Sequence, residues 1–391
     1  MKKLLIYLPL VFLSIGMYAQ QSVSVAPEKK HKMAVFTPLY LDDAFNSAGE
    51  YRFSSKSFPK NSLTGLEFYH GVSMAIDSLN KLNIPLDVYV YDSKSARETI
   101  EQQFSKCAAD GVELILANTS ISELGLLARL AADKKITLIN ATVPNDANTV
   151  KNPYFVVINP TLNTQIEGLY QYLKKNYTDN QIIFFTHSGG NSEDYIKKGF
   201  EVLNSSSKTI SLKYVEIGNS DAVSKAIEAL DNTKPAIFVA GSLDGTFGNN
   251  VIIRAADETK NFPKVTALGM PTWENLNLSK PEFKDVEIIY GTPFYRSGND
   301  VASRAISTAY NKKMFARPSD LVYRSYGLTY RFGSLLNQYG KDINKHLDDK
   351  GNRMFYDYHI QPVYLNGTLG YYENKKLYFL KYLNGSLQQV M

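Results

Sequence analysis

Residues 112–146 constrain the fold most, because this stretch alternates apolar runs with one amphipathic segment. Residues 112–116 form an apolar run of the kind that fills buried parallel strands. A helical pattern follows, with leucine and alanine side chains on one face and Ser122 placed to cap its start. Residues 136–139 form the next apolar run. This order of strand, helix and strand predicts a parallel sheet covered by helices.

Small polar residues follow both of these predicted strands. Asn118, Thr119 and Ser120 come after the first strand, and Ala141 and Thr142 come after the second. In open α/β sheets, ligands bind beyond the carboxyl ends of the strands. Hydroxyl, amide and backbone groups at two neighbouring strand ends therefore predict a binding pocket for a small polar solute.

The same alternation continues along the 391 residues, a length that exceeds one ordinary hydrophobic core. The pattern predicts a two-lobed α/β protein in which each lobe is a parallel sheet flanked by helices. We expect residues 33–155 to form the first lobe, with residues 290–345 returning to it. We expect residues 156–289 to form the second lobe, with residues 346–391 returning to it.

Residues 354–391 show the shorter alternation of antiparallel strands, with Asn-Gly turns at 366–367 and 384–385. They predict a small antiparallel C-terminal appendage. Residues 42–62 form a polar, aromatic stretch without a regular pattern. Such a long insertion is either a functional flap beside the binding site or disordered.

The first twenty residues predict a secretory signal peptide, with Lys2 and Lys3 before an apolar run and the small residue Ala19 near the cleavage point. Residues 21–32 predict a flexible leader. We therefore expect a periplasmic or secreted protein that is soluble after cleavage. The single cysteine, Cys107, lies far from the cleavage point, so we expect no lipid anchor, and its neighbours predict a buried helical position.

The sequence lacks the usual signatures of catalysis and cofactor binding. The loop at 187–191 has neither the Gly-x-Ser-x-Gly pattern of hydrolases nor the Gly-Lys-Ser/Thr ending of phosphate loops. His359 has no cysteine or acid at metal-ligand spacing. A formal net charge of +5 without an extended basic run argues against nucleic acid as a ligand. We therefore expect no enzyme activity, no metal and no cofactor.

The order of the predicted elements resembles the type I periplasmic solute-binding proteins, the group that includes the leucine/isoleucine/valine-binding proteins. Residues 71–80, GVSMAIDSLN, are similar to the first helix of that family. Residues 118–120 and 141–142 stand where the family has its two ligand loops in the first lobe. Residues 193–195, followed by Gly199-Phe200, resemble the loop where the family offers an aromatic side chain.

The resemblance implies a fold that closes on an amino acid or a related small solute. Ser120, Ala141 and Thr142 would hold the carboxylate of the solute, and Tyr195 would cover it. An acidic residue from the second lobe would meet the ammonium group, because buried charges need partners. Asp244 is the acid that follows the strand predicted at 236–240.

Trp273, the only tryptophan, follows another predicted strand and either stacks on the ligand or packs in the core. Two functions stay open. The chain either binds a small solute for a membrane transporter, or it is a non-transport envelope scaffold or regulator of cell-wall synthesis with an envelope protein as its partner. The first predicts stabilisation by a solute, and the second predicts exposed aromatic surface without a solute response.

Overall fold

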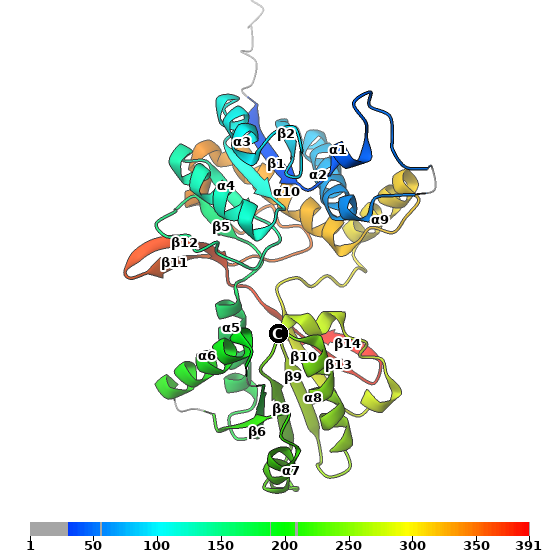
Figure 1. Cartoon of the computed structure of the whole chain (residues 1–391), viewed down its shortest axis with the longest axis vertical. Helices are drawn as coiled ribbons and strands as arrows, with labels where there is room; N and C mark the ends of the chain where they lie inside the picture. Colours follow the sequence, from blue (N-terminus) through cyan, green and yellow to red (C-terminus); the bar gives the residue numbers. More distant parts are fainter. Residues whose placement is uncertain (1–29, 55–56, 188, 208–209, 391) are drawn as a thin grey trace, which may run out of the picture. The chain divides into compact units, whose positions relative to one another are not determined.

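Two seven-stranded sheets organise the chain in the computed structural model, which describes residues 30–54, 57–187, 189–207 and 210–390 (Figure 1). The first sheet contains β1 (His31–Thr37), β2 (Leu86–Asp92), β3 (Leu114–Ala117), β4 (Thr137–Asn140), β5 (Phe155–Val157), β11 (Ile360–Leu365) and β12 (Thr368–Asn374). Its strand order is β11-β12-β5-β4-β3-β1-β2, and only the β11–β12 pair is antiparallel.

Helices cover both faces of the first sheet. Successive residues of β1 point to opposite faces, so that Met33 and Val35 join one apolar core while Ala34 and Phe36 join another. The first core includes α2 (Leu63–Lys81) and α10 (Asp320–Tyr339), and the second includes α3 (Ile100–Ala109) and α4 (Ile121–Lys134). A further helix, α9 (Val301–Met314), precedes α10 and adds Ile306 to the first core, and η4 (Gly340–Lys345) follows α10.

The second sheet contains β6 (Gln181–Thr186), β7 (Leu212–Glu216), β8 (Ala236–Ala240), β9 (Val265–Gly269), β10 (Glu287–Thr292), β13 (Tyr378–Leu383) and β14 (Ser386–Gln389). Its order is β14-β13-β10-β9-β8-β6-β7, in which β13 pairs antiparallel with both β10 and β14. The core on one face includes α5 (Leu162–Asn176) and α6 (Asn191–Ser207). The core on the other face includes α7 (Ser220–Glu228), α8 (Gly245–Asp257) and the short helices η2 (Pro271–Asn275) and η3 (Pro281–Phe283).

These two helix-flanked, mostly parallel sheets confirm the predicted fold class. The two Asn-Gly turns are also present, and all four turn residues have the positive φ angles, from 49° to 77°, that tight hairpins require. The assignment of all of residues 346–391 to the second lobe is wrong. The β11–β12 hairpin extends the first sheet, where Tyr372 of β12 pairs with Val156 of β5, and only β13 and β14 join the second sheet.

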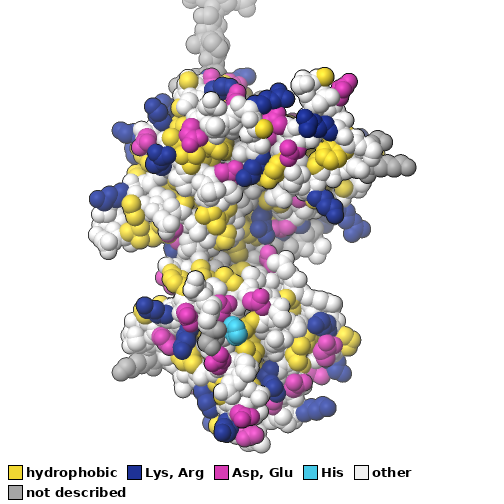
Figure 2. Space-filling model, viewed as in Figure 1, with side chains coloured by type: hydrophobic (Ala, Val, Ile, Leu, Met, Phe, Trp, Pro, Cys, Tyr) yellow, Lys and Arg dark blue, Asp and Glu magenta, His cyan; other side chains and the backbone are white. Residues whose placement is uncertain are grey.

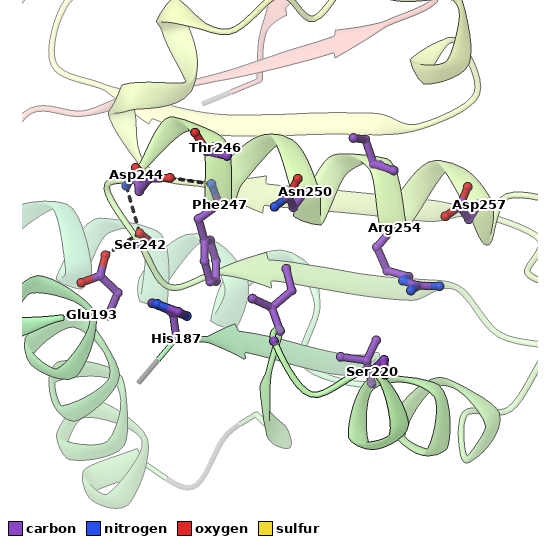
Figure 3. A pocket seen from close by; sticks show the side chains of 14 residues that line it. His187, Glu193, Ser220, Ser242, Asp244, Thr246, Phe247, Asn250, Arg254 and Asp257 are labelled. Carbon is purple, nitrogen blue, oxygen red and sulfur yellow. Dashed lines mark hydrogen bonds between the residues drawn. The ribbon is translucent and has the colours of Figure 1, made fainter. Parts of the chain in front are cut away.

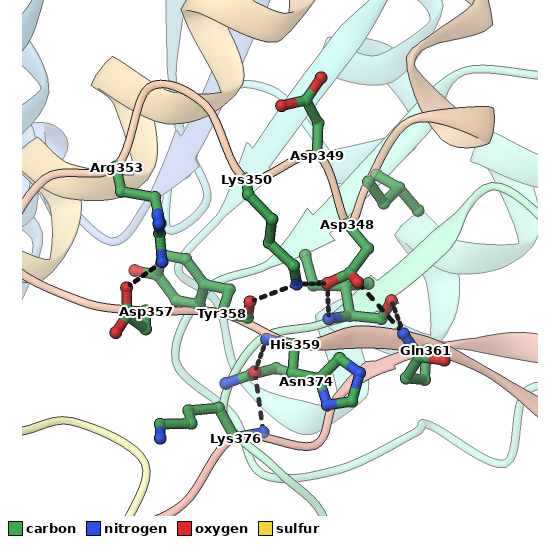
Figure 4. A network of polar contacts seen from close by, with 12 residues as sticks. Asp348, Asp349, Lys350, Arg353, Asp357, Tyr358, His359, Gln361, Asn374 and Lys376 are labelled. Atoms are coloured by element: carbon green, nitrogen blue, oxygen red, sulfur yellow. Dashed lines mark hydrogen bonds and ion pairs between the residues drawn. The ribbon is translucent and has the colours of Figure 1, made fainter.

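The segments that cross between the sheets are fixed by buried polar contacts at the end of β12. Glu373 is 1% exposed, and it accepts hydrogen bonds from the Thr161 backbone N–H (2.7 Å) and from the hydroxyls of Thr161 (2.9 Å) and Thr164 (2.7 Å). Its other carboxylate oxygen pairs with Lys375 Nζ at 2.7 Å. Asn374 accepts the backbone N–H groups of His359 and Lys376 (Figure 4). These contacts join the start of α5 to the chain that leaves β12.

Two local predictions also need revision, for the leader and for the insertion at 42–62. Strand β1 begins at His31, two residues inside the expected leader, where the His31 ring contacts the Glu113 carboxylate at 2.8 Å. The signal peptide and residues 21–29 lie outside the described residues. The insertion at 42–62 carries local structure in its described part: the end of α1 (Leu41–Ala44), a bridge between Phe45 and Tyr51, and η1 (Lys60–Ser62).

Cys107 occupies the buried helical position that the sequence predicts, on α3. Burial, together with the nearby Asp110 charge, raises the pKa of its thiol to about 12, so the thiol stays protonated near neutral pH. Within the described part of the chain, no helix combines the length and the apolar character needed to span a bilayer.

Candidate functional site

The first half of the candidate site lies where the strand order of the first sheet reverses. The chain passes from β1 to β2 on one side and then returns to β3 on the other side of β1. The carboxyl ends of β1 and β3 therefore flank a topological switch point, the place where open α/β sheets bind ligands. Asn118 donates to Thr37 Oγ1 at 3.0 Å and accepts from Thr142 Oγ1 at 3.0 Å. These three side chains tie the ends of β1, β3 and β4 together.

The other predicted residues of this half lie in the same place with different environments. Thr119 is 7% exposed, and its hydroxyl has no hydrogen-bond partner among the described residues. Ala141 is buried, and its backbone N–H bonds to Ala117 O. Asn159, which the sequence analysis did not select, donates to the Thr142 carbonyl at 2.8 Å. The buried Thr119 hydroxyl is therefore the group here that still lacks a partner, and a buried unpaired hydroxyl is costly.

Ser120, not Ser122 as predicted, caps α4, which begins at Ile121. The Ser120 backbone N–H and hydroxyl both donate to the Glu123 carboxylate, at 2.8 and 2.7 Å. This pairing of a serine with a glutamate three residues later is the capping-box spacing. Because Ser120 already uses its donors in the helix cap, a ligand would have to compete with Glu123 for them.

The second half of the candidate site lies at the corresponding switch point of the second sheet, between β6 and β8. A pocket of about 750 Å³ opens there and is lined from the ends of β6, β7 and β8 and from α7 and α8 (Figure 3). Ser242, directly after β8, donates to Glu193 Oε1 at 2.6 Å and accepts the Asp244 backbone N–H at 2.9 Å. His187 follows β6 and lies near the Phe247 ring, with 6.5 Å between centroids.

One end of this pocket, which we call the inner end, is acidic and is lined by Glu193 and Asp244 together with His187. Burial raises the pKa of the Glu193 carboxyl, but hydrogen bonds from Ser242 and Ser192 and the nearby His187 outweigh burial and place the pKa below its ordinary value. The ionised Glu193 carboxylate therefore stabilises the folded protein at pH values above the ordinary carboxyl pKa. This stabilisation is lost as the pH falls through the lowered pKa of Glu193. Figure 2 shows acidic side chains around a histidine on this lobe.

The three residues predicted in the second lobe have different surroundings. Asp244 lines the pocket and caps α8 by accepting the Phe247 N–H at 2.6 Å. Tyr195 is 48% exposed on α6, does not line this pocket, and donates to Asn163 Oδ1 at 2.6 Å. Trp273 is fully buried in the core beside α8, which matches the core alternative for this residue.

Four further site residues were not selected from the sequence. Thr37 and Ser242 are strand-end residues, so the rule that found Asn118 and Thr142 could have included them. Glu193 lies 49 positions from Ser242, and no local pattern links the two. Asn159 stands next to a proline in a crossing segment and gave no chemical signal. Across the described ranges, no group of three His, Cys, Asp or Glu side chains is arranged to hold a metal.

Residues 60–366 match the family model described as periplasmic binding protein. The chain belongs to this family. A comparison with curated proteins finds no match.

Solved structures of periplasmic binding proteins share the fold of this family member. One is named as a branched-chain amino acid ABC transporter protein from Rhodospirillum rubrum; it has a TM-score of 0.64 and 13% identity, over 93% of this chain and 100% of that one. A branched-chain amino acid ABC transporter periplasmic ligand-binding protein from Burkholderia xenovorans has a TM-score of 0.58 and 15% identity, over 93% and 95% of the two chains. A leucine-binding protein from Thermotoga maritima has a TM-score of 0.52 and 13% identity, over 92% and 98%.

Proposed function

We propose that this chain is an exported binding protein that holds a small polar solute with an ammonium group and delivers it to a membrane transporter. The observation that carries the proposal is the placement of polar clusters at the switch points of both sheets. The names of the structural relatives, which refer to branched-chain amino acid transport and leucine binding, support the same class of solute. Export would follow from the signal peptide predicted at residues 1–20.

The chemistry of the two halves favours a solute with an ammonium group and at least one hydrogen-bond acceptor. In the second lobe, the Glu193 and Asp244 carboxylates line the pocket and favour a cation. In the first lobe, the unpartnered Thr119 hydroxyl can donate a hydrogen bond to an acceptor of the solute, whereas the Thr142 hydroxyl already donates to Asn118 Oδ1. We propose that closure of the two lobes brings both halves onto one solute, as hinge-closing binding proteins do.

Glu193→Gln is expected to weaken solute binding by about 10- to 100-fold, because a charge-assisted hydrogen bond contributes about 1.5–3 kcal/mol. The amide keeps the size of the side chain and removes its charge. Isothermal titration of the variant and the native chain with leucine and related amino acids measures the change.

Glu201→Gln is the matched control, because Glu201 lies on the same helix and its ion pair with Lys197 is exposed. It should bind as the native chain does. Equal affinities for the native chain and Glu193→Gln would contradict the placement of the ammonium group. A complete lack of solute binding by the native chain would contradict the transport role and leave the envelope scaffold as the reading to test.

A further inference from the structure

The pocket of the second lobe carries two carboxylates at one end, and a guanidinium together with one carboxylate at the other. Its inner end carries Glu193, Asp244 and His187, while Arg254 lies at the other end with Ser220 at the start of α7 (Figure 3). The Arg254 guanidinium is half-buried and points toward Ser220 in this view. Within the described chain, Arg254 makes no hydrogen bond or ion pair. Asp257 is the acid at this end and also lines the pocket, without an ion pair to Arg254.

The two ends are farther apart than the charges of a free amino acid. Asp244 caps α8 and Arg254 lies ten positions later on the same helix, so their backbones are separated by about 15 Å at 1.5 Å per residue. An extended chain advances about 3.3–3.6 Å per residue. In an extended tri- or tetrapeptide, the N-terminal ammonium group and the C-terminal carboxylate are therefore about 10–14 Å apart. The length of the Arg254 side chain accounts for the rest of the separation of about 15 Å.

The walls of the pocket between its two ends suit a ligand that has small apolar side chains and a polar backbone. Four apolar side chains line the pocket, Phe247 and Ile253 from α8, Val223 from α7 and Ile217 after β7, and Asn250 of α8 adds an amide. Gly218 also lines the pocket and adds no side chain to it. The pocket volume of about 750 Å³ lies in the upper part of the range of ligand pockets, about 300–1,000 Å³.

We infer that the preferred solute of this protein is a short peptide of three or four small apolar residues, bound along α8. Its ammonium group lies at Glu193 and Asp244, and its carboxylate lies at Arg254 and the start of α7. Arginine binds a carboxylate through two parallel hydrogen bonds, and the amino end of α7 adds a favourable dipole. The inference rests on the proposed function, since it takes the same pocket as the binding site and names the class of solute.

Isothermal titration with L-alanine, dialanine, trialanine, tetraalanine and tetraalanine amide tests the inference. We expect the affinity to rise by at least tenfold from dialanine to tri- or tetraalanine, and to fall about tenfold when the carboxylate of tetraalanine is replaced by the amide. Arg254→Met should bind tetraalanine and its amide equally, because the variant removes the group that distinguishes them. Lys225→Met on α7 is the matched control, since Lys225 is exposed and does not line the pocket.

The possible outcomes separate the two proposals. Binding of alanine or leucine without any gain for tri- and tetraalanine would overturn the peptide inference and leave the solute-binding function standing. A penalty for the amide that persists in Arg254→Met would overturn the position of the carboxylate. Failure of the native chain to bind any amino acid or peptide would contradict both proposals. A urea unfolding midpoint of Arg254→Met equal to that of Lys225→Met shows that lost binding is not lost folding.

Discussion

Trp273→Ala is expected to lower the free energy of unfolding by about 3–5 kcal/mol, the range for truncating a fully buried large aromatic side chain. Trp273 is 0% exposed, and its indole occupies space that two glycines leave open. An added Cβ at Gly248 would lie 2.2 Å from the indole Nε1, and one at Gly269 would lie 2.0 Å from Cε2. Since the surrounding backbone is fixed by β9 and α8, little collapse into the cavity is expected. Urea unfolding followed by far-ultraviolet circular dichroism measures the loss.

Val202→Ala on α6 is the control for this prediction, because Val202 is 57% exposed and its truncation should change stability by less than about 0.5 kcal/mol. Trp273 is also the only tryptophan of the chain, so its emission in the native protein reports the unfolding of the second-sheet core. A loss below about 1 kcal/mol in Trp273→Ala would contradict the packing described for that core.

Glu373→Ala is expected to destabilise the protein by about 3 kcal/mol or more, because it removes the acceptor of the buried Thr161 and Thr164 donors and leaves the Lys375 ammonium without its counter-charge. The Glu373 carboxylate accepts hydrogen bonds from Thr161 and Thr164 and forms an ion pair with Lys375, at distances between 2.7 and 2.9 Å. Glu373 is the penultimate residue of β12 in the first sheet, while its threonine partners lie at the start of α5, which packs against the second sheet. The unfolding midpoint in urea measures the effect.

Glu373→Gln provides the graded comparison, since the amide keeps one oxygen acceptor for the threonine donors and loses the ion pair with Lys375. It should lose less stability than the alanine variant. Equal stability of Glu373→Ala and the native chain would show that the crossing segments do not depend on this network.

The sequence predicts the parallel parts of both sheets well because each strand and helix carries its own periodicity. Strands β8 and β9 lie where their apolar runs predict them, at Ala236–Ala240 and Val265–Gly269. The C-terminal hairpins were harder to place. An Asn-Gly turn fixes the register of its own hairpin, but the pairing of β12 with β5 joins residues more than 200 positions apart. No local pattern states which sheet such a hairpin extends.

The candidate site shows the same division between local and distant information. Asn118 and Thr142 could be predicted because parallel strands place their carboxyl ends at one edge of the sheet. The helix cap was misplaced by two residues, since Ser120 and Ser122 are both suitable caps and only the Glu123 carboxylate decides between them. The meeting of Glu193 with Ser242 depends on the packing of α6 beside the loop after β8, which the order of residues does not reveal.

The most direct test of the central claim is the thermal unfolding midpoint of the chain from Gln21 with a panel of amino acids, short peptides, sugars and cell-wall fragments. A solute at about one hundred times its dissociation constant should add about 2.7 kcal/mol of stability. The account predicts a clear rise in the midpoint with an amino acid or peptide that carries a free ammonium group, and no rise with its N-acetylated form. A panel in which no ammonium-bearing solute raises the midpoint, or in which the N-acetylated form raises it equally, would contradict the claim.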